Sequence, residues 1–166
     1  DDKFWNTPCY KSTEEIAEKY LCPITLTGSQ HQLDTKALKQ SAGDYLLSDA
    51  ELRYTDELLE RQLSEIRERT LERNCVVIVV CNIKHAERVH ALLDNSILTH
   101  SKLPNKTQLR NIEEWKSGKY KFMISVNQLS TGFDHPPLDC IAALRPTRSY
   151  TLYVQLLGRG RRKHPS

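Results

Sequence analysis

The sequence lacks several features that would place it in a familiar class. It has no apolar run long enough to cross a bilayer, and its first residues show no secretory signal pattern. It also has no G-x-x-x-x-G-K-[S/T] loop to cradle nucleotide phosphates and no D-E-x-[D/H] carboxylate pair to hold Mg²⁺. These absences argue against a membrane protein and against a complete nucleotide-hydrolysing site in this chain. We expect a cytoplasmic protein without a membrane partner.

Cysteine is present, but not in the pattern of a metal site or a disulfide framework. The five cysteines are an odd number, and no two have C-x-x-C spacing. Cys75, Cys81 and Cys140 lie in or beside apolar runs, where cysteine behaves as a small hydrophobic residue. We predict reduced, structural cysteines and no metal site.

The second half of the chain alternates between strand-like and helix-like patterns. The run from Val76 to Val80 is continuously β-branched, which is typical of a strand buried on both faces of a parallel sheet. Further strands are predicted at 97–100, 122–126 and 139–144, and helices at 85–93, 105–117 and 150–157. In the helix at 105–117 we expect Leu109, Ile112 and Trp115 to face inward, and Gly118 to end it. With 166 residues, of which 39% are hydrophobic, the chain is long enough for one real core. The alternation predicts an α/β fold with three layers and a mostly parallel sheet.

The first half gives weaker signals. Residues 1–20 are interpreted as a connector, residues 20–29 as a strand and residues 33–40 as a short helical turn. A long helix is expected from Ser48 or Asp49 to about Arg73, because one apolar stripe recurs at helical spacing along it, made by Leu52, Leu59, Leu63, Ile66 and Thr70. Three acidic residues also precede arginines by four positions along it, in the pairs Asp49–Arg53, Glu57–Arg61 and Glu65–Arg69. The charges are therefore interpreted as a solvated helix face.

Charge is distributed unevenly. Residues 140–166 contain six Lys and Arg and no acid, whereas residues 1–139 carry a net charge of −3. In a helix, Gln155, Arg159 and Arg162 would share one flank, because they are spaced i, i+4 and i+7. The pattern favours an anionic partner near the C-terminal end, although a solvated basic tail would give the same charge count.

Two motifs carry a resemblance to a known family. STGFD (Ser130 to Asp134) and QLLGRGRR (Gln155 to Arg162) resemble motifs V and VI of superfamily 2 helicases, the second at every fixed position of Q-x-x-G-R-x-x-R. The intervening DHPPLDCIAALRPTRS is similar to bacterial DNA helicases and restriction-type motor subunits. The resemblance implies that 21–166 is a C-terminal RecA-like domain, preceded in a longer protein by an N-terminal RecA-like domain.

The resemblance also implies roles for the residues of these motifs. Arg159 and Arg162 would act as arginine fingers on the γ-phosphate of ATP, and Gln155 would help to organise that site. Gly132 and Asp134 would contribute to nucleotide binding from the loop after a strand. ATP with Mg²⁺ would be held mainly by the N-terminal domain.

A nucleic-acid track is the second implication. Asn82 and Lys84 leave the first buried strand where the family's motif IV lies, and His100 and Ser101 leave the next strand. Arg110 matches an arginine that recurs in the family. Each residue taken singly also fits a loop position, a helix cap or a solvent ion pair. The glutamine that opens motif VI favours DNA over RNA.

Two functions from different classes are therefore expected. The first is the second motor domain of an ATP-dependent DNA helicase or translocase, inactive alone because the phosphate loop and carboxylate pair are absent. The alternative is a non-catalytic module that binds nucleic acid electrostatically through its basic C-terminal end.

Overall fold

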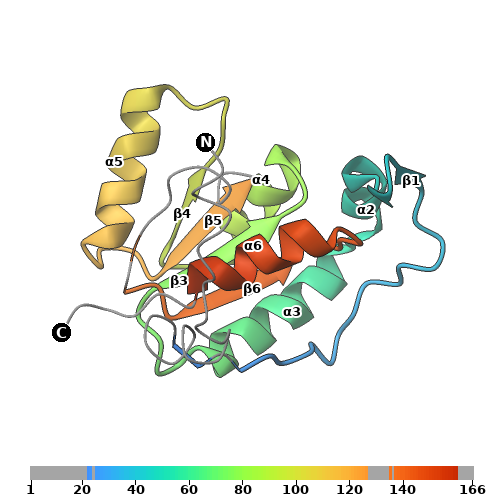
Figure 1. Ribbon diagram of the computed structural model, residues 1–166. Coiled ribbons are helices and arrows are strands. Elements are labelled where there is room, and N and C mark those ends of the chain that lie inside the picture. Colours follow the sequence, from blue (N-terminus) through green and yellow to red (C-terminus); the bar gives the residue numbers. More distant parts are fainter. Residues whose placement is uncertain (1–21, 24, 127–134, 136, 161–166) are drawn as a thin grey trace, which may run out of the picture.

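The computed structural model describes residues 22–23, 25–126, 135 and 137–160. Figure 1 shows a twisted sheet covered by helices on both faces. The predicted connector 1–20, Gly132, Asp134 and Arg162 lie outside the described residues. Among the residues that are described, no helix combines the length and the apolar character that a membrane crossing requires.

The central sheet has four parallel strands in the order β4-β5-β3-β6. Their bounds are β3 Val76–Val80, β4 Ser96–Thr99, β5 Phe122–Val126 and β6 Cys140–Leu144. All five residues of β3 are buried, because β3 pairs with β5 and β6 at its two edges and its side chains enter an apolar core on each face. These strands confirm the prediction of a parallel sheet and match the predicted ranges within a residue.

Two apolar cores separate the helices into layers. Helices α2 (Leu47–Arg53), α3 (Asp56–Arg69) and α4 (Ile83–Leu92) pack on the face of β3 that carries Ile78. Helices α5 (Asn105–Lys116) and α6 (Tyr150–Gly160) pack through Trp115 and Leu156 on the face that carries Val77. The three-layer α/β prediction is confirmed.

The predicted long helix from residue 48 or 49 to residue 73 is wrong, because the chain forms α2 and α3 with a break between them. Thr55 begins the second helix, and its Oγ1 accepts a hydrogen bond from the Leu58 N–H at 3.2 Å. Leu52, which was expected in the apolar stripe, is 71% exposed. The three predicted i, i+4 ion pairs are present, at Asp49–Arg53, Glu57–Arg61 and Glu65–Arg69.

The prediction of a strand at 20–29 is also wrong for the residues of that segment that are described, none of which is in a strand. None of the described residues in this segment is buried, and Leu26 is 60% exposed, so they give no apolar face to support a strand. Instead a small hairpin follows, with β1 at Gln40–Ser41 and β2 at Asp44–Tyr45. Ala42 and Gly43 turn it with φ of 50° and 84°, as a two-residue hairpin loop requires.

Helix α5 is rotated relative to its predicted orientation. Leu109 was expected to face the core but is 62% exposed, whereas Asn111 is buried. The Asn111 side-chain amide donates to the Leu98 carbonyl of β4 at 2.9 Å, so a hydrogen bond takes the place of an apolar contact. Trp115 is buried as predicted, and Gly118 follows the helix with φ of 80°.

The described cysteines agree with a structural role. Cys22, Cys75, Cys81 and Cys140 form no disulfide. Cys75 and Cys81 are buried, and burial raises the pKa of both thiols. They are therefore poor nucleophiles at neutral pH.

Candidate functional site

Four strands end at one edge of the sheet, and the candidate site residues follow them. Asn82 comes after β3, and His100 and Ser101 come after β4. Because β5 lies between β3 and β4, these two groups are separated by two strand spacings, or about 10 Å. The loop that carries Gly132 and Asp134 leaves β5 outside the described residues. The sheet therefore brings Asn82 and Ser101 to one rim.

Asn82 acts as the N-cap of α4. Its Oδ1 accepts a hydrogen bond from the His85 N–H at 2.9 Å, which satisfies one of the donors at the start of the helix. The His85 ring lies beneath it, and its Nδ1 accepts from the Cys81 N–H at 3.3 Å. Asn82 thus fills the role of a helix cap, as the structural alternative predicted. A ligand would have to bind the side-chain amide N–H groups that remain.

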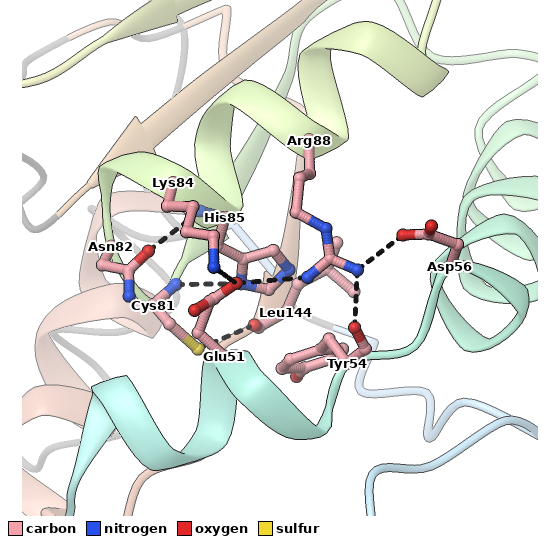
Figure 2. Close-up of polar contacts among 9 residues, drawn as sticks. All are labelled: Glu51, Tyr54, Asp56, Cys81, Asn82, Lys84, His85, Arg88 and Leu144. Carbon is pink, nitrogen blue, oxygen red and sulfur yellow. Dashed lines mark hydrogen bonds and ion pairs between the residues drawn. The ribbon is translucent and has the colours of Figure 1, made fainter.

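Lys84 is the second residue of α4, and its side chain is 68% exposed. Its Nζ is 3.7 Å from Oε1 of Glu51, a carboxylate that is buried on α2. Figure 2 shows Glu51 between Lys84 and Arg88, with the Arg88 guanidinium 3.2 Å from the same oxygen. The 3.7 Å ion pair between Lys84 and Glu51 is long, and the ammonium group is exposed to solvent, so the pair contributes little stability. The ammonium group can therefore leave Glu51 and bind a phosphate with little loss of free energy.

Arg88 joins three parts of the protein. Besides Glu51, its guanidinium donates to the Tyr54 carbonyl and to the Asp56 carboxylate, both at 2.6 Å. Figure 2 shows this arginine reaching from α4 to the junction of α2 and α3. These contacts hold the junction between α2 and α3 against α4, although the two helices are separate.

His100 and Ser101 differ in their access to solvent. His100 is only 7% exposed, and its buried Nδ1 has no hydrogen-bond partner among the described residues. Ser101 is exposed. Of this pair, Ser101 is the residue that can contact a backbone phosphate directly. The prediction for His100 therefore requires the ligand to approach its ring closely.

Arg110 is exposed on α5, away from the ends of the strands. The ion pairs formed within the described part of the chain do not include it. Its guanidinium is thus available to an anion, but the fold does not bring it next to Asn82.

Helix α6 carries the glutamine and the first arginine of the C-terminal motif. Ser149 caps it, because its Oγ accepts from the Leu152 N–H at 3.3 Å. Leu156 packs inward, whereas Gln155 is exposed. Gln155 and Arg159 are one helical turn apart on this helix. The side chain of Arg159 and all of Arg162 lie outside what is described, so their shared flank stays a prediction.

The profile of the helicase conserved C-terminal domain matches residues 55–164. The chain belongs to this family. The match covers the four-stranded sheet, α3 to α6 and the Q-x-x-G-R-x-x-R motif, as expected for a C-terminal RecA-like domain.

A curated relative agrees with this assignment. The putative ATP-dependent helicase IRC3 of Saccharomyces cerevisiae is 29% identical over 160 residues, which cover 92% of this chain. Those residues make up only 23% of the relative's length, so the chain corresponds to less than a quarter of that protein.

Solved structures share the fold of this helicase C-terminal domain. S. cerevisiae Dbp5 bound to RNA and ADP BeF3 superposes with a TM-score of 0.56 and 20% identity, over 66% of this chain and 31% of that one. Dbp5 L327V bound to Gle1 H337R and IP6 gives a TM-score of 0.52 and 17% identity, over 63% of this chain and 29% of that one. At these identities the likeness shows the fold alone.

Two carboxylates of the helicase domain were missed by the sequence analysis. Glu51 is buried against Arg88, and Asp44 is joined to the segment before α6. Both lie before residue 55, where the family match begins. Neither stands in a motif, and the two partners that join Asp44 to the segment before α6, Thr147 and Arg148, are more than 100 residues away in the sequence. No local sequence signal could have identified them.

Proposed function

We propose that this chain is the second motor domain of an ATP-dependent DNA helicase or translocase, preceded in the longer protein by an N-terminal RecA-like domain. The observation that carries the proposal is the family match, which ends over Q-x-x-G-R-x-x-R on a helix that follows the edge strand of a parallel sheet. Ligands of such sheets gather beyond the carboxyl ends of the strands.

The donor set of the motif fits the phosphates of ATP. Gln155 is exposed on α6, and the guanidinium groups of Arg159 and Arg162 carry N–H donors whose planar geometry matches phosphate oxygens. These groups are not ligands of Mg²⁺, which prefers carboxylate, carbonyl and water oxygens. ATP bound with Mg²⁺ would supply the phosphoryl group for hydrolysis. This chain would bind its γ-phosphate oxygens and stabilise the charge that develops there.

The nucleic-acid track is proposed at the rim formed by the ends of β3 and β4. Ser101 and Lys84 are exposed there and can contact backbone phosphates, which requires no reading of bases. Asn82 and His100 would contribute less, because one is a helix cap and the other is buried. Arg110 would extend the track along α5. DNA is proposed as the partner from the motif VI glutamine, and RNA is the alternative that binding assays must compare.

The experiment that tests the arginine-finger role uses the longer protein. Arg162→Ala should lower ATP turnover on the order of a thousandfold, because it removes a guanidinium group that stabilises the charge on the γ-phosphate in the transition state. Nucleotide and DNA binding should remain nearly unchanged. The matched control is Arg161→Ala, which changes the same kind of side chain one position away. Unchanged turnover in Arg162→Ala, or an equal loss in both variants, would refute the role.

The two expected functions are separated by measuring hydrolysis and binding together. A motor domain predicts nucleic-acid-stimulated ATP hydrolysis by the longer protein and none by residues 1–166 alone. A non-catalytic module predicts salt-sensitive binding by both and hydrolysis by neither. ATP hydrolysis by the isolated chain would show that the half-site interpretation is wrong.

A further inference from the structure

Asp44 fastens the segment between β6 and α6 to the small hairpin. Its Oδ2 accepts a hydrogen bond from the Thr147 hydroxyl at 2.8 Å, and its Oδ1 accepts from the Arg148 N–H at 2.6 Å. The Arg148 guanidinium also donates to the Gln40 side-chain oxygen on the neighbouring strand. The hairpin therefore holds both the backbone and the side chains of residues 147–148.

These bonds continue into the first turn of α6. The Thr147 Oγ1 that donates to Asp44 also accepts from the Ser149 N–H at 3.0 Å. Ser149 then caps the helix through its Oγ, and its carbonyl accepts from the Tyr153 N–H at 3.1 Å. An unbroken series of hydrogen bonds thus runs from the Asp44 carboxylate to the beginning of the helix that carries Gln155 and Arg159.

The hairpin itself is firmly anchored. We call the hairpin and α2 together (residues 40–53) the clasp. Asp49 of the clasp accepts from the N–H of Lys39, the residue before the hairpin, at 3.0 Å. Ala50 is fully buried in the first core, and Glu51 is paired with Arg88 of α4. Figure 1 shows α2 and the hairpin on the side where β6 ends and α6 begins. The clasp can therefore act as a fixed reference for α6.

The Asp44 carboxylate is ionised, which strengthens its hydrogen bonds to residues 147–148. Partial burial would raise the pKa of Asp44, but the hydrogen bonds from Arg148, Thr147 and Tyr45 and the nearby charge of Arg145 outweigh that effect and lower it. Asp44 is thus ionised at neutral pH, and hydrogen bonds to an ionised acceptor are the stronger kind.

From these contacts we propose that Asp44 is a positioning residue that sets the place and direction of α6 for nucleotide hydrolysis. The inference deepens the proposed function and rests on it. It also assigns a role to a residue outside the family-matched region, because Asp44 precedes residue 55. Catalysis by groups on α6 depends on their placement, and a misplacement of about 1 Å can cost on the order of a hundredfold in rate.

The first test measures hydrogen exchange of backbone amides in this chain. Asp44→Ala should speed exchange at Arg148, Leu152 and Tyr153 by about tenfold or more relative to the β3 amides, because two charge-assisted bonds are lost. Asp44→Asn should give a smaller effect, since its carbonyl can still accept from Arg148. Asp34→Asn is the matched control: Asp34 is exposed, and its carboxylate accepts from the Lys36 N–H two residues away. Exchange in α6 that rises no more than exchange in β3 would overturn the proposal.

The second test measures ATP hydrolysis by the longer protein. Asp44→Ala should lower kcat about tenfold or more with little change in the KM for ATP, whereas Asp34→Asn should match the wild type. An unchanged kcat would overturn the role of Asp44 in turnover. If the wild-type longer protein hydrolyses no ATP, the proposed function fails, whereas unaltered exchange in α6 refutes the positioning role whatever the hydrolysis result.

Discussion

Burial of His85 should make the stability of this domain fall as the solution becomes acidic. The side chain is fully buried on α4, and its ring centroid lies 4.4 Å from that of Tyr54. Figure 2 shows it surrounded by Cys81, Glu51 and Arg88. Burial, and then the positive charge of Arg88, lower its pKa from 6.5 to about 4. The folded state therefore holds a neutral imidazole at pH 5, where the unfolded chain holds a protonated one.

The sign and the size of the effect follow from proton linkage. Between pH 6.5 and pH 4 the unfolded state binds the additional proton, so the free energy of unfolding rises with pH across this window and is lost as pH falls through it. Each pKa unit is about 1.4 kcal/mol, so the lowered pKa corresponds to a loss of about 3 kcal/mol once the pH reaches about 4. This is a large share of the stability of a small domain.

Urea unfolding at pH 7, 6, 5 and 4.5 checks the prediction. His85→Asn is the reference variant, because Asn has an acceptor near the Nδ1 position for the Cys81 N–H but does not titrate. The wild type should lose about 2–3 kcal/mol more than this variant between pH 7 and pH 4.5. Equal losses in the two proteins, or an NMR titration of His85 near pH 6.5, would show that burial does not suppress its protonation.

Three further changes test other contacts. Glu51→Ala should lower the free energy of unfolding by about 2 kcal/mol. This is less than the usual cost of breaking a buried ion pair, because the Arg88 guanidinium still binds the Tyr54 carbonyl and the Asp56 carboxylate. Urea unfolding with no loss of stability would contradict the pairing. Thr55→Ala should lower the free energy of unfolding by about 1 kcal/mol in the same assay, and Thr55→Ser should keep the wild-type value. Equal stability of the wild type and both variants would show that Thr55 does not act as a stabilising helix cap. Lys84→Ala should leave stability within about 0.5 kcal/mol and reduce the salt dependence of nucleic-acid binding by about one phosphate contact; an unchanged salt slope would remove Lys84 from the track.

The sheet could be predicted because its signals are local. The five consecutive β-branched residues of β3 are buried on both faces, and Gly118 ends α5 as its position suggested. The hairpin of the clasp could not be predicted, because two-residue strands are too short to show a period. The orientation of α5 was misjudged for another reason: the bond from Asn111 to β4 depends on a neighbour that sequence periodicity does not reveal.

The candidate site also combines features that local sequence signals could predict with features that depend on the packing of distant elements. The positions of Asn82 and Ser101 followed from where buried strands end, since parallel strands share one carboxyl edge. The burial of His100 and the pairing of Lys84 with Glu51 depend on the packing of other elements and had no signal in the sequence. Asp44 is the clearest case, because its role depends on a contact between distant parts of the chain.

The clasp also distinguishes the unit that folds from the region that the family profile matches, which begins at residue 55. A version of the domain trimmed to begin at Thr55 would keep every family motif but lose Ala50 and Tyr54, both buried in the first core. The apolar surface beneath them would meet water, and Arg88 would lose two of its three partners. Such a version should be prone to self-association. Boundaries for work on this domain are therefore better set before the hairpin than at the first recognisable motif.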